Sequence, residues 1–300
     1  MKHLFVKVFH LNNIFRDITA RLAYQLILNR PIDQGALEKW KDFLKQNPLH
    51  RTYLINSLFL SEEYRSLILA DPLVDLIMMN YLHRERCELV RSLPAAKVIL
   101  DIGGASSNIP RGALLTMGYP HPFDKLLIVD VPPQGSFEQR LSKEQYNVVQ
   151  TELGEIRYIY KDMSDLAQIG LHADSIDLVW MGQTVEHIEE EKFDRLLSLI
   201  RQYLKPDGYF CFDTPNRRIT SLQSPNRYIH PDHKIEYHFR DIVAKLKRED
   251  FNIVQTLGIG LSKEMIMQNQ FMPAYIIENM RINQNPEDSY IFYFKVQKKT

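Results

Sequence analysis

The stretch KVILDIGGASSN, residues 97–108, decides the fold of this chain. It begins as a short apolar run, ends that run at Asp101, and continues through Gly103 and Gly104 into small polar residues. Glycines allow a tight turn and let a ligand lie against the backbone, because they carry no Cβ. A helix-like segment follows at 109–119, and the first turn of a helix presents unpaired N–H groups. The pattern therefore predicts a strand, a ligand-binding turn and a helix.

Beyond this segment, short apolar runs alternate with amphipathic stretches to the end of the chain. The strand-like runs lie at 125–130, 155–163, 175–182, 208–216, 251–258 and 291–299, and the helical patterns at 193–204 and 239–250. This alternation predicts an α/β domain with a mostly parallel sheet covered on both faces by helices. The last run has no helix after it, so we expect it to pair antiparallel at or near the sheet edge.

The ends of the next strands carry side chains suited to a nucleoside. Asp130 closes the second strand, where a carboxylate can accept hydrogen bonds from both ribose hydroxyls. Asp162 and Met163 close the third, where an acid can accept from an adenine amino group and a methionine can cover the ring. The fourth strand, with its continuation SIDLVWMGQTVEHI at 175–188, runs toward the edge where open α/β sheets bind ligands.

This order of motifs resembles class I S-adenosylmethionine-dependent methyltransferases over residues 97–299, on DIGG, IVD, KDM, DLVWMGQTVEHI and LKPDGYFCFDTPN. The resemblance implies a Rossmann-like, seven-stranded, mostly parallel sheet with an antiparallel last strand, and S-adenosylmethionine as the cofactor. The implied cofactor-binding residues are Asp101, Gly103 and Gly104 at the amino-acid tail, Asp130 at the ribose, Asp162 and Met163 at the adenine, with Ala105 and Gln183 as further contacts. The family often has a third glycine where Ser107 stands, which leaves room for a degenerate site. A nicotinamide-binding Rossmann protein is the alternative, but GGASSN lacks the G-x-G-x-x-G spacing.

Glu186, His187 and His233 are the candidate catalytic residues. The Glu-His pair follows the fourth strand, and His233 lies in a second histidine-rich segment, HPDHKIEYHF, at 230–239. A histidine here can take the proton of a substrate hydroxyl as that hydroxyl attacks the methyl group. Alternatively, carboxylate and imidazole ligands can hold a divalent ion that acidifies and orients the hydroxyl.

A resemblance to known families also supports the metal hypothesis. The segments QTVEHI and HPDHKIEYHF together resemble the metal-binding pattern of small-RNA 2′-O-methyltransferases, and the Glu-His pair alone resembles ubiquinone-pathway O-methyltransferases. The implied metal ligands are Glu186, His187 and His233, with His230 as a weaker candidate. Those patterns carry a glutamate where this chain has Gln183, which lowers the expected metal affinity. A purely structural alternative is that Glu and His cap the helix starting near residue 189, with the later histidines, His233 and His238, bonded to backbone.

The first 93 residues predict a separate all-helical domain, and residues 94–300 the α/β domain. In the first helical pattern, Ile18, Leu22, Leu26 and Ile27 recur at helical spacing. The stretches AYQLILNRPIDQGALEKWKDFL and LINSLFLSEEYR follow within residues 17–65. They resemble a small bacterial helical domain of unknown function that accompanies glycosyltransferases, methyltransferases and surface-layer or secreted proteins. The resemblance implies a setting in bacterial glycan or cell-surface polysaccharide assembly. The alternative is a helical cap that buries apolar area and makes a homo-oligomer.

Composition narrows the partners and the location. Lys plus Arg and Asp plus Glu number 37 each, so the formal net charge is zero and gives no global reason to expect nucleic acid. The two cysteines cannot build a disulfide framework, and Cys211 reads as a small buried hydrophobe. We find neither a signal peptide nor an apolar run of the roughly 20 residues that a membrane helix needs. We therefore expect a cytoplasmic, bacterial protein.

The sequence as a whole predicts an S-adenosylmethionine-dependent methyltransferase, O-directed, acting on a sugar or a glycan intermediate. Two other functions stay open: a non-catalytic adaptor that keeps the fold but has lost the cofactor, and a metal-dependent RNA 2′-O-methyltransferase. Residues 261–286 are rich in Met and Asn, and we expect them to form a lid or an interface.

Overall fold

The computed structural model describes residues 16–47, 51–69, 72–105, 110–131, 147–268, 276 and 278–299. These residues form two compact units. One holds the described residues up to Ile77 together with those of Glu264–Ile276, and the other holds those of Met78–Lys263 and Ile277–Thr300. The division falls inside helix α5 (Pro72–Arg91), whereas the sequence suggested a boundary at 93/94.

Side-chain caps begin two of the helices of the helical unit. Its helices comprise residues 16–28, α2 (Gln34–Gln46), α3 (Arg51–Phe59), α4 (Glu62–Leu69), the start of α5 and most of α10 (Lys263–Met267). Asp33 caps α2 by accepting a hydrogen bond from the Ala36 N–H at 2.8 Å, and Ser61 Oγ accepts from the Tyr64 N–H at 3.1 Å before α4. Their core gathers Tyr24, Leu28, Leu37, Leu44, Leu54 and Leu58.

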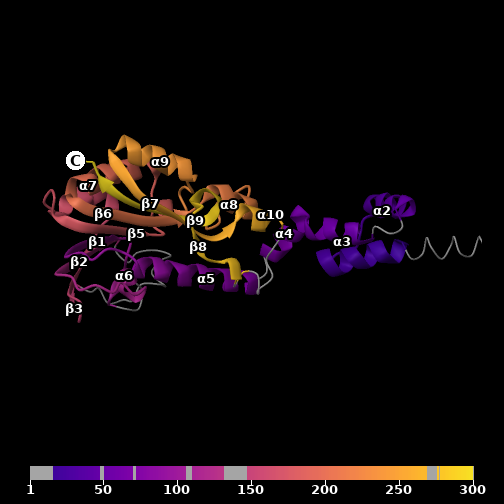
Figure 1. Ribbon diagram of the computed structural model, residues 1–300, viewed down its shortest axis with the longest axis horizontal. Coiled ribbons are helices and arrows are strands. Elements are labelled where there is room, and N and C mark those ends of the chain that lie inside the picture. Colours follow the sequence, from indigo (N-terminus) through magenta and orange to yellow (C-terminus); the bar gives the residue numbers. More distant parts are fainter. Residues whose placement is uncertain are drawn as a thin grey trace, which may run out of the picture. The chain divides into compact units, whose positions relative to one another are not determined.

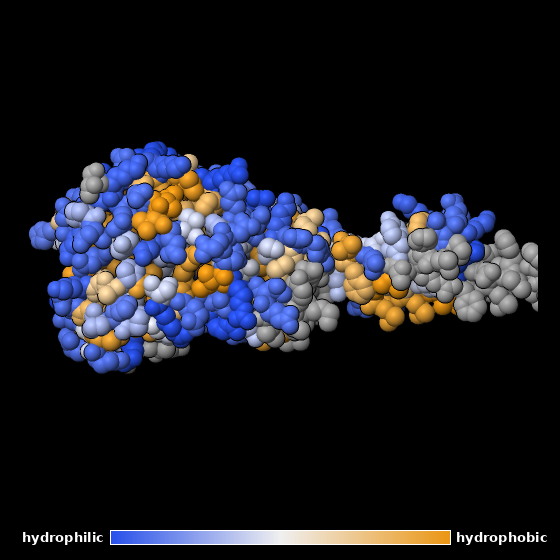
Figure 2. All heavy atoms as spheres, viewed as in Figure 1, coloured by the Kyte–Doolittle hydropathy of each residue, from blue (hydrophilic) through white to orange (hydrophobic). Residues whose placement is uncertain are grey.

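The apolar face predicted for the first helix is wrong in part. Ile18, Leu22 and Leu26 are 45%, 53% and 80% exposed, and Figure 2 shows apolar surface on this unit. The buried side chains are instead Ala20, Ala23, Tyr24 and Leu28, with Ile27 partly buried. Small residues at helical spacing let neighbouring helices approach closely, so the face with alanines is the one that packs.

The other unit is built on a mixed sheet of nine strands in its described part. The strands are β1 (Val98–Ile102), β2 (Lys125–Asp130), β3 (Val148–Gln150), β4 (Glu155–Tyr160), β5 (Ile176–Gly182), β6 (Leu204–Pro215), β7 (Phe251–Ser262), β8 (Ile282–Asn283) and β9 (Ser289–Lys298). Their order is β3-β4-β2-β1-β5-β6-β9-β7-β8. The run from β4 to β6 is parallel, while β9 is antiparallel to both of its neighbours.

The predicted α/β fold is therefore confirmed, with one correction. All seven predicted strands form, but the short antiparallel strands β3 and β8 extend the described sheet to nine. The last strand, β9, pairs antiparallel near the edge as predicted, and it lies between β6 and β7, with the two-residue β8 beyond them. Its first six residues are all buried, so both of its faces are covered, which suits an interior strand.

Helices cover the two faces of this sheet. Helices α7 (Glu190–Tyr203) and α9 (Phe239–Arg248) lie on one side of the strands, while α5 and α6 (Gly112–Thr116) lie on the other (Figure 1). Leu100 and Ile102 belong to the core that α7 and α9 close. Because side chains alternate along a strand, Asp101 between them faces α5 and α6. Shorter elements complete the unit: η2 (Met163–Ile169), η3 (Val185–His187), α8 (Arg217–Gln223) and η4 (Pro286–Asp288).

The segment 261–286 divides between the two units. Ile266 in α10 is buried, and the Arg65 Nε donates a hydrogen bond to its carbonyl at 3.1 Å within the helical unit. Residues 269–275 and 277 lie outside the described residues, so a lid or interface there stays a prediction. Among the helices in the described ranges, none combines the length and the apolar character needed to cross a membrane.

Candidate functional site

A cavity of about 230 Å³ opens beside the end of β1. The strand and its turn contribute Asp101, Gly103 and Gly104; the other lining residues are His83 and Arg86 of α5, Ala113, Thr116 and Met117 of α6 and its end, and Trp180 and Gly182 of β5. The cavity therefore lies at the carboxyl edge of two adjacent parallel strands, where the sequence predicted a ligand site.

Asp101 is the most unusual group in this cavity. Its side chain is buried, and neither of its carboxylate oxygens has a hydrogen-bond partner. Burial, and next the charge of Asp130, raise its pKa to about 8, while the Leu114 backbone N–H acts in the opposite direction as the smallest of the three effects. A buried acid without a partner beside a cavity indicates a site for a polar or cationic ligand group.

The turn after β1 requires both of its glycines. Gly103 has φ +80°, and a Cβ there would lie 2.5 Å from Thr184 Oγ1. A Cβ on Gly104 would lie 2.0 Å from an Asp101 carboxylate oxygen. The glycine pair thus lets the backbone fold tightly over the buried acid, as the sequence pattern predicts.

Asp130 joins the same region through Ala105. Its Oδ2 accepts a hydrogen bond from the Ala105 N–H at 2.9 Å, its Oδ1 accepts from the Val131 N–H at 2.8 Å, and burial raises its pKa. The described cavity lining does not include Asp162, which is exposed, or Met163, which packs partly against the core. Their contacts with adenine remain a prediction. Ser107 lies outside the described residues.

A buried ion pair beneath the cavity escaped the sequence analysis. Arg86 donates from Nε to Asp213 Oδ2 at 2.5 Å, and Asp213 is fully buried. Asp213 also accepts from the Gln183 backbone N–H through Oδ1, at 2.9 Å, and through its carbonyl, at 3.0 Å. These bonds hold Gln183 in a left-handed conformation, φ +53°, directly after β5. An acid inside the apolar run YFCFDTP, here Asp213, indicates that a buried carboxylate needs a donor or a cation, but the sequence does not show which residue supplies it.

A second cluster forms where β5 ends. Glu186 and His187 lie in η3, and the 230–239 segment brings His233 to them. One ligand atom from each of these three residues lies within 4.8 Å of the others. The His187 and His233 rings are 5.0 Å apart. His230 stands 6.2 Å and 5.4 Å from those rings, outside the group of three.

Each member of the cluster is held by other polar groups. Glu186 is buried, accepts from Thr214 Oγ1 at 2.8 Å, and has its pKa raised to about 7, chiefly by burial. His187 Nδ1 lies 3.3 Å from the Asp232 carbonyl oxygen, an acceptor only, which places the proton on Nδ1. Burial and the neighbouring His233 lower the pKa of His187, so the neutral imidazole is favoured.

His233 is oriented by a carboxylate that the sequence analysis missed. Its Nδ1 lies 2.8 Å from Glu236 Oε1. Although burial raises the pKa of Glu236, hydrogen bonds from His233, Thr220 and the Ile229 N–H hold that pKa below its ordinary value. A charged carboxylate on Nδ1 leaves Nε2 to act as a base or a metal ligand, as in carboxylate–histidine–metal sites.

The helix-capping alternative for the Glu-His pair is wrong. The N-cap of α7 is Glu189, no side chain caps that helix, and Glu186 and His187 form the separate turn η3. The cluster can therefore offer one carboxylate and two imidazoles to a proton or to a divalent ion. The side chain of Gln183, which stands where the related patterns carry a glutamate, donates from Nε2 to Asp213 Oδ1 at 3.4 Å.

A mostly parallel sheet with a glycine turn, a strand-end acid and a cavity at the carboxyl edge defines the class of Rossmann-like nucleotide-binding folds. A family model described as a methyltransferase domain matches residues 77–256, and the chain belongs to this family. This membership confirms the predicted methyltransferase, and with it S-adenosylmethionine as the expected methyl donor. The match excludes the N-terminal helices, so their glycan-related setting remains a prediction. No curated protein matches the chain in sequence.

Several solved structures are similar to the chain. An S-adenosylmethionine-dependent methyltransferase from Archaeoglobus fulgidus is 17% identical over 74% of this chain and 94% of its own, with a TM-score of 0.46. A TehB-like methyltransferase from Corynebacterium glutamicum is 16% identical over 72% and 88%, with a TM-score of 0.40. A small RNA methyltransferase is 12% identical over 74% of this chain but 25% of its own, with a TM-score of 0.48. Family membership therefore rests on the sequence match.

Proposed function

We propose that this protein transfers the methyl group of S-adenosylmethionine to a hydroxyl of a sugar or glycan intermediate. The assignment of the cofactor rests on one observation. Asp101 is buried without a hydrogen-bond partner, beside a cavity whose lining includes the two obligatory glycines. Its carboxylate would hold the ammonium of the amino-acid tail, and Asp130 would hold the ribose. The bound cofactor supplies an electrophilic methyl group on its sulfonium.

The acceptor half rests on the cluster of Glu186, His187 and His233. His233 Nε2 would take the proton of the acceptor hydroxyl, and Glu236 would stabilise the imidazolium that results. His187 would hold the same hydroxyl in line. Much of the acceleration would come from this alignment, because a fixed nucleophile needs little further activation.

The same three residues would also fit a divalent ion. Two imidazoles and one carboxylate suit zinc, iron or manganese, and the Glu186 carboxylate is buried between the two histidines' ligand atoms and Thr214. In that case the ion would acidify the hydroxyl and His233 would be a ligand instead of a base. Removal of metal separates the two mechanisms.

Labelled S-adenosylmethionine with a panel of sugars and glycan intermediates tests the proposal, with and without EDTA. We expect binding of the donor by calorimetry, methyl transfer to at least one sugar hydroxyl, and loss of transfer in His233→Asn. The exposed His172→Asn is the matched control and should transfer normally. Absence of donor binding at millimolar concentration would favour the non-catalytic adaptor. Loss of activity in EDTA, restored by manganese or zinc, would assign the metal mechanism.

Three further predictions belong to this proposal. We place the protein in the bacterial cytoplasm, divide it into a helical module and a methyltransferase domain, and expect the helical module to mediate a homo-oligomer. The exposed apolar residues of the first helix support the last point. Cell fractionation tests the location, and light scattering of the full chain tests the oligomer, which substitution of Leu22 and Leu26 by Glu should dissociate.

A further inference from the structure

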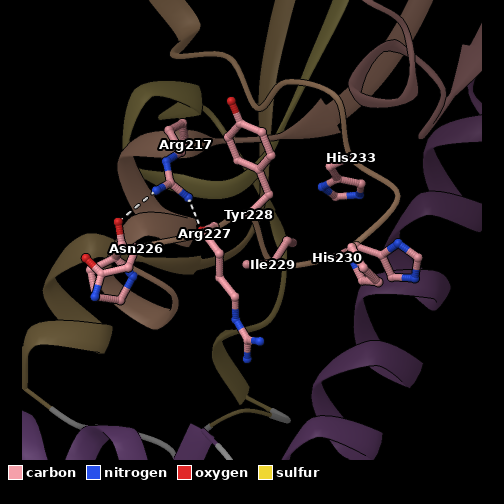
Figure 3. A pocket seen from close by; sticks show the side chains of 9 residues that line it. Arg217, Asn226, Arg227, Tyr228, Ile229, His230 and His233 are labelled. Atoms are coloured by element: carbon pink, nitrogen blue, oxygen red, sulfur yellow. Dashed lines mark hydrogen bonds between the residues drawn. The ribbon is translucent and has the colours of Figure 1, made fainter.

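A second and larger cavity, of about 630 Å³, adjoins the acceptor cluster. It is lined by Arg217 of α8 and by the loop that follows this helix, including Pro225, Arg227, Tyr228, Ile229 and His233 (Figure 3). His233 belongs to both the cavity and the cluster. A molecule seated here would therefore present its own groups to the imidazole that the proposed function uses.

Arg217 builds this cavity but is not available to a ligand. Its guanidinium donates to the carbonyls of Arg227, at 2.9 Å, and Pro225, at 3.1 Å, and to Glu236 at 3.3 Å. Its side chain is 17% exposed, and Figure 3 shows it turned toward the loop backbone. Its positive charge is matched by Glu236, so its role is to brace the loop that carries the other lining residues.

Arg227 is the available cation of the cavity. Its residue is exposed, its side chain runs away from Arg217 (Figure 3), and among the described residues no acid pairs with it. Arg217 is already neutralised, so the lining carries one unmatched guanidinium. A guanidinium binds phosphate and carboxylate through two parallel hydrogen bonds, which makes it selective for such anions.

The rest of the lining suits a ring with an apolar face. Tyr228, Ile229 and the two prolines Pro225 and Pro231 supply apolar surface to the same lining. Aromatic and apolar side chains contact the C–H faces of sugars, while polar groups fix orientation. The lining thus combines a guanidinium, apolar surface and a histidine that can act as a base or a ligand.

We propose that the acceptor is an anionic sugar, bearing a phosphate or a carboxylate that Arg227 binds while a ring hydroxyl reaches His233. The assignment of the hydroxyl to methyl transfer rests on the proposed function. The recognition of the anion by Arg227 does not, because it can be measured without the donor. RNA also carries phosphates, but the chain has no net positive charge to favour it.

Direct binding to the full chain tests the proposal, with glucose 1-phosphate, glucuronate and methyl glucoside as probes in ligand-observed NMR. We expect at least one of the two anionic sugars to bind about tenfold or more tightly than the neutral one. Arg227→Ala should remove that advantage, while Arg195→Ala, which removes an equally exposed arginine on α7, should not. Whichever of glucose 1-phosphate and glucuronate binds more tightly shows whether Arg227 recognises a phosphate or a carboxylate. Equal binding of the neutral sugar, or an unchanged advantage in Arg227→Ala, would overturn the proposal.

Calorimetry with S-adenosylmethionine separates this inference from the proposed function. Arg227→Ala should bind the donor like the wild type and show a raised KM for the anionic acceptor. If S-adenosylmethionine does not bind but the binding of the sugar phosphate still depends on Arg227, the proposed function fails and the anion site stands. If wild type methylates anionic and neutral sugars equally well, and Arg227→Ala methylates the anionic sugar like the wild type, the anion site fails and the methyltransferase stands. Tighter, Arg227-dependent binding of a short RNA would overturn the sugar assignment.

Discussion

Replacing Asp101 by Asn should stabilise the ligand-free protein and weaken cofactor binding. Burial and the charge of Asp130 raise the pKa of the Asp101 carboxyl from 3.8 to about 8, and each tenfold change in a protonation equilibrium corresponds to about 1.4 kcal/mol. The buried charge therefore costs up to about 6 kcal/mol at pH 8, as an upper limit. The Asn amide would still lack partners, which costs about 1–3 kcal/mol. The difference is at most about 3–5 kcal/mol, and because the site around a buried charge relaxes in part we expect a net gain of about 2 kcal/mol.

The sign of this effect depends on pH. Between about pH 4 and pH 8 the folded protein holds a proton on Asp101 that the unfolded chain has released, so wild-type stability falls as pH rises. The advantage of Asp101→Asn should grow from pH 5 to pH 8 and then level off. Near pH 8, thermal unfolding should show a melting temperature higher by roughly 5 °C. The exposed Asp207→Asn is the matched control and should leave the melting temperature unchanged.

In the presence of the methyl donor, Asp101→Asn should lose the advantage that it has in the ligand-free protein. S-adenosylmethionine carries an ammonium that the charged Asp101 would bind, and loss of one charge-assisted contact should weaken binding about tenfold to a hundredfold. The donor should then raise the melting temperature of the wild type but not of Asp101→Asn. Destabilisation of the ligand-free variant at pH 8, or an unchanged response to the donor, would refute the reasoning.

Three other substitutions test separate parts of the site. Gly104→Ala places a Cβ against the neighbouring carboxylate, so calorimetry should show donor affinity at least about tenfold weaker; wild-type affinity would contradict this. Arg86→Met leaves Asp213 buried and unpaired and should cost about 3–5 kcal/mol in urea unfolding, whereas a loss below about 1 kcal/mol would show the pair to be dispensable. Glu236→Gln should slow methyl transfer about 10–100-fold without weakening donor binding, because His233 loses its orienting charge; an unaltered rate would remove Glu236 from the mechanism.

The parts of the fold that the sequence predicts are those set by local patterns. The apolar runs and the glycine turn fix the strands, and alternation along β1 places Asp101 on the face opposite Leu100 and Ile102. The position of β9 could not be read locally, because an antiparallel strand with two buried faces fits several places in a sheet. The prediction of the packing face of the first helix was wrong in part for a similar reason, because the neighbouring helices decide which apolar stripe is covered.

The residues of the candidate acceptor cluster were predictable from the sequence, whereas the residues that hold them in place were not. Glu186, His187 and His233 were identifiable from residue type and their position after strands, and the structure brings them together. Their supporting partners were not. Glu236 looks like an ordinary loop acid, and the Arg86–Asp213 pair joins residues 127 positions apart. Only the fold can show such pairings, because no periodicity links the two sides.

The central claim is that the cavity at Asp101 receives the amino-acid tail of the methyl donor. A crystal structure of the full chain with S-adenosylhomocysteine measures this directly. We predict density for the tail ammonium against the Asp101 carboxylate and for the ribose hydroxyls against Asp130. A nucleoside bound elsewhere, or a cavity filled by protein side chains in the presence of the ligand, would contradict the account.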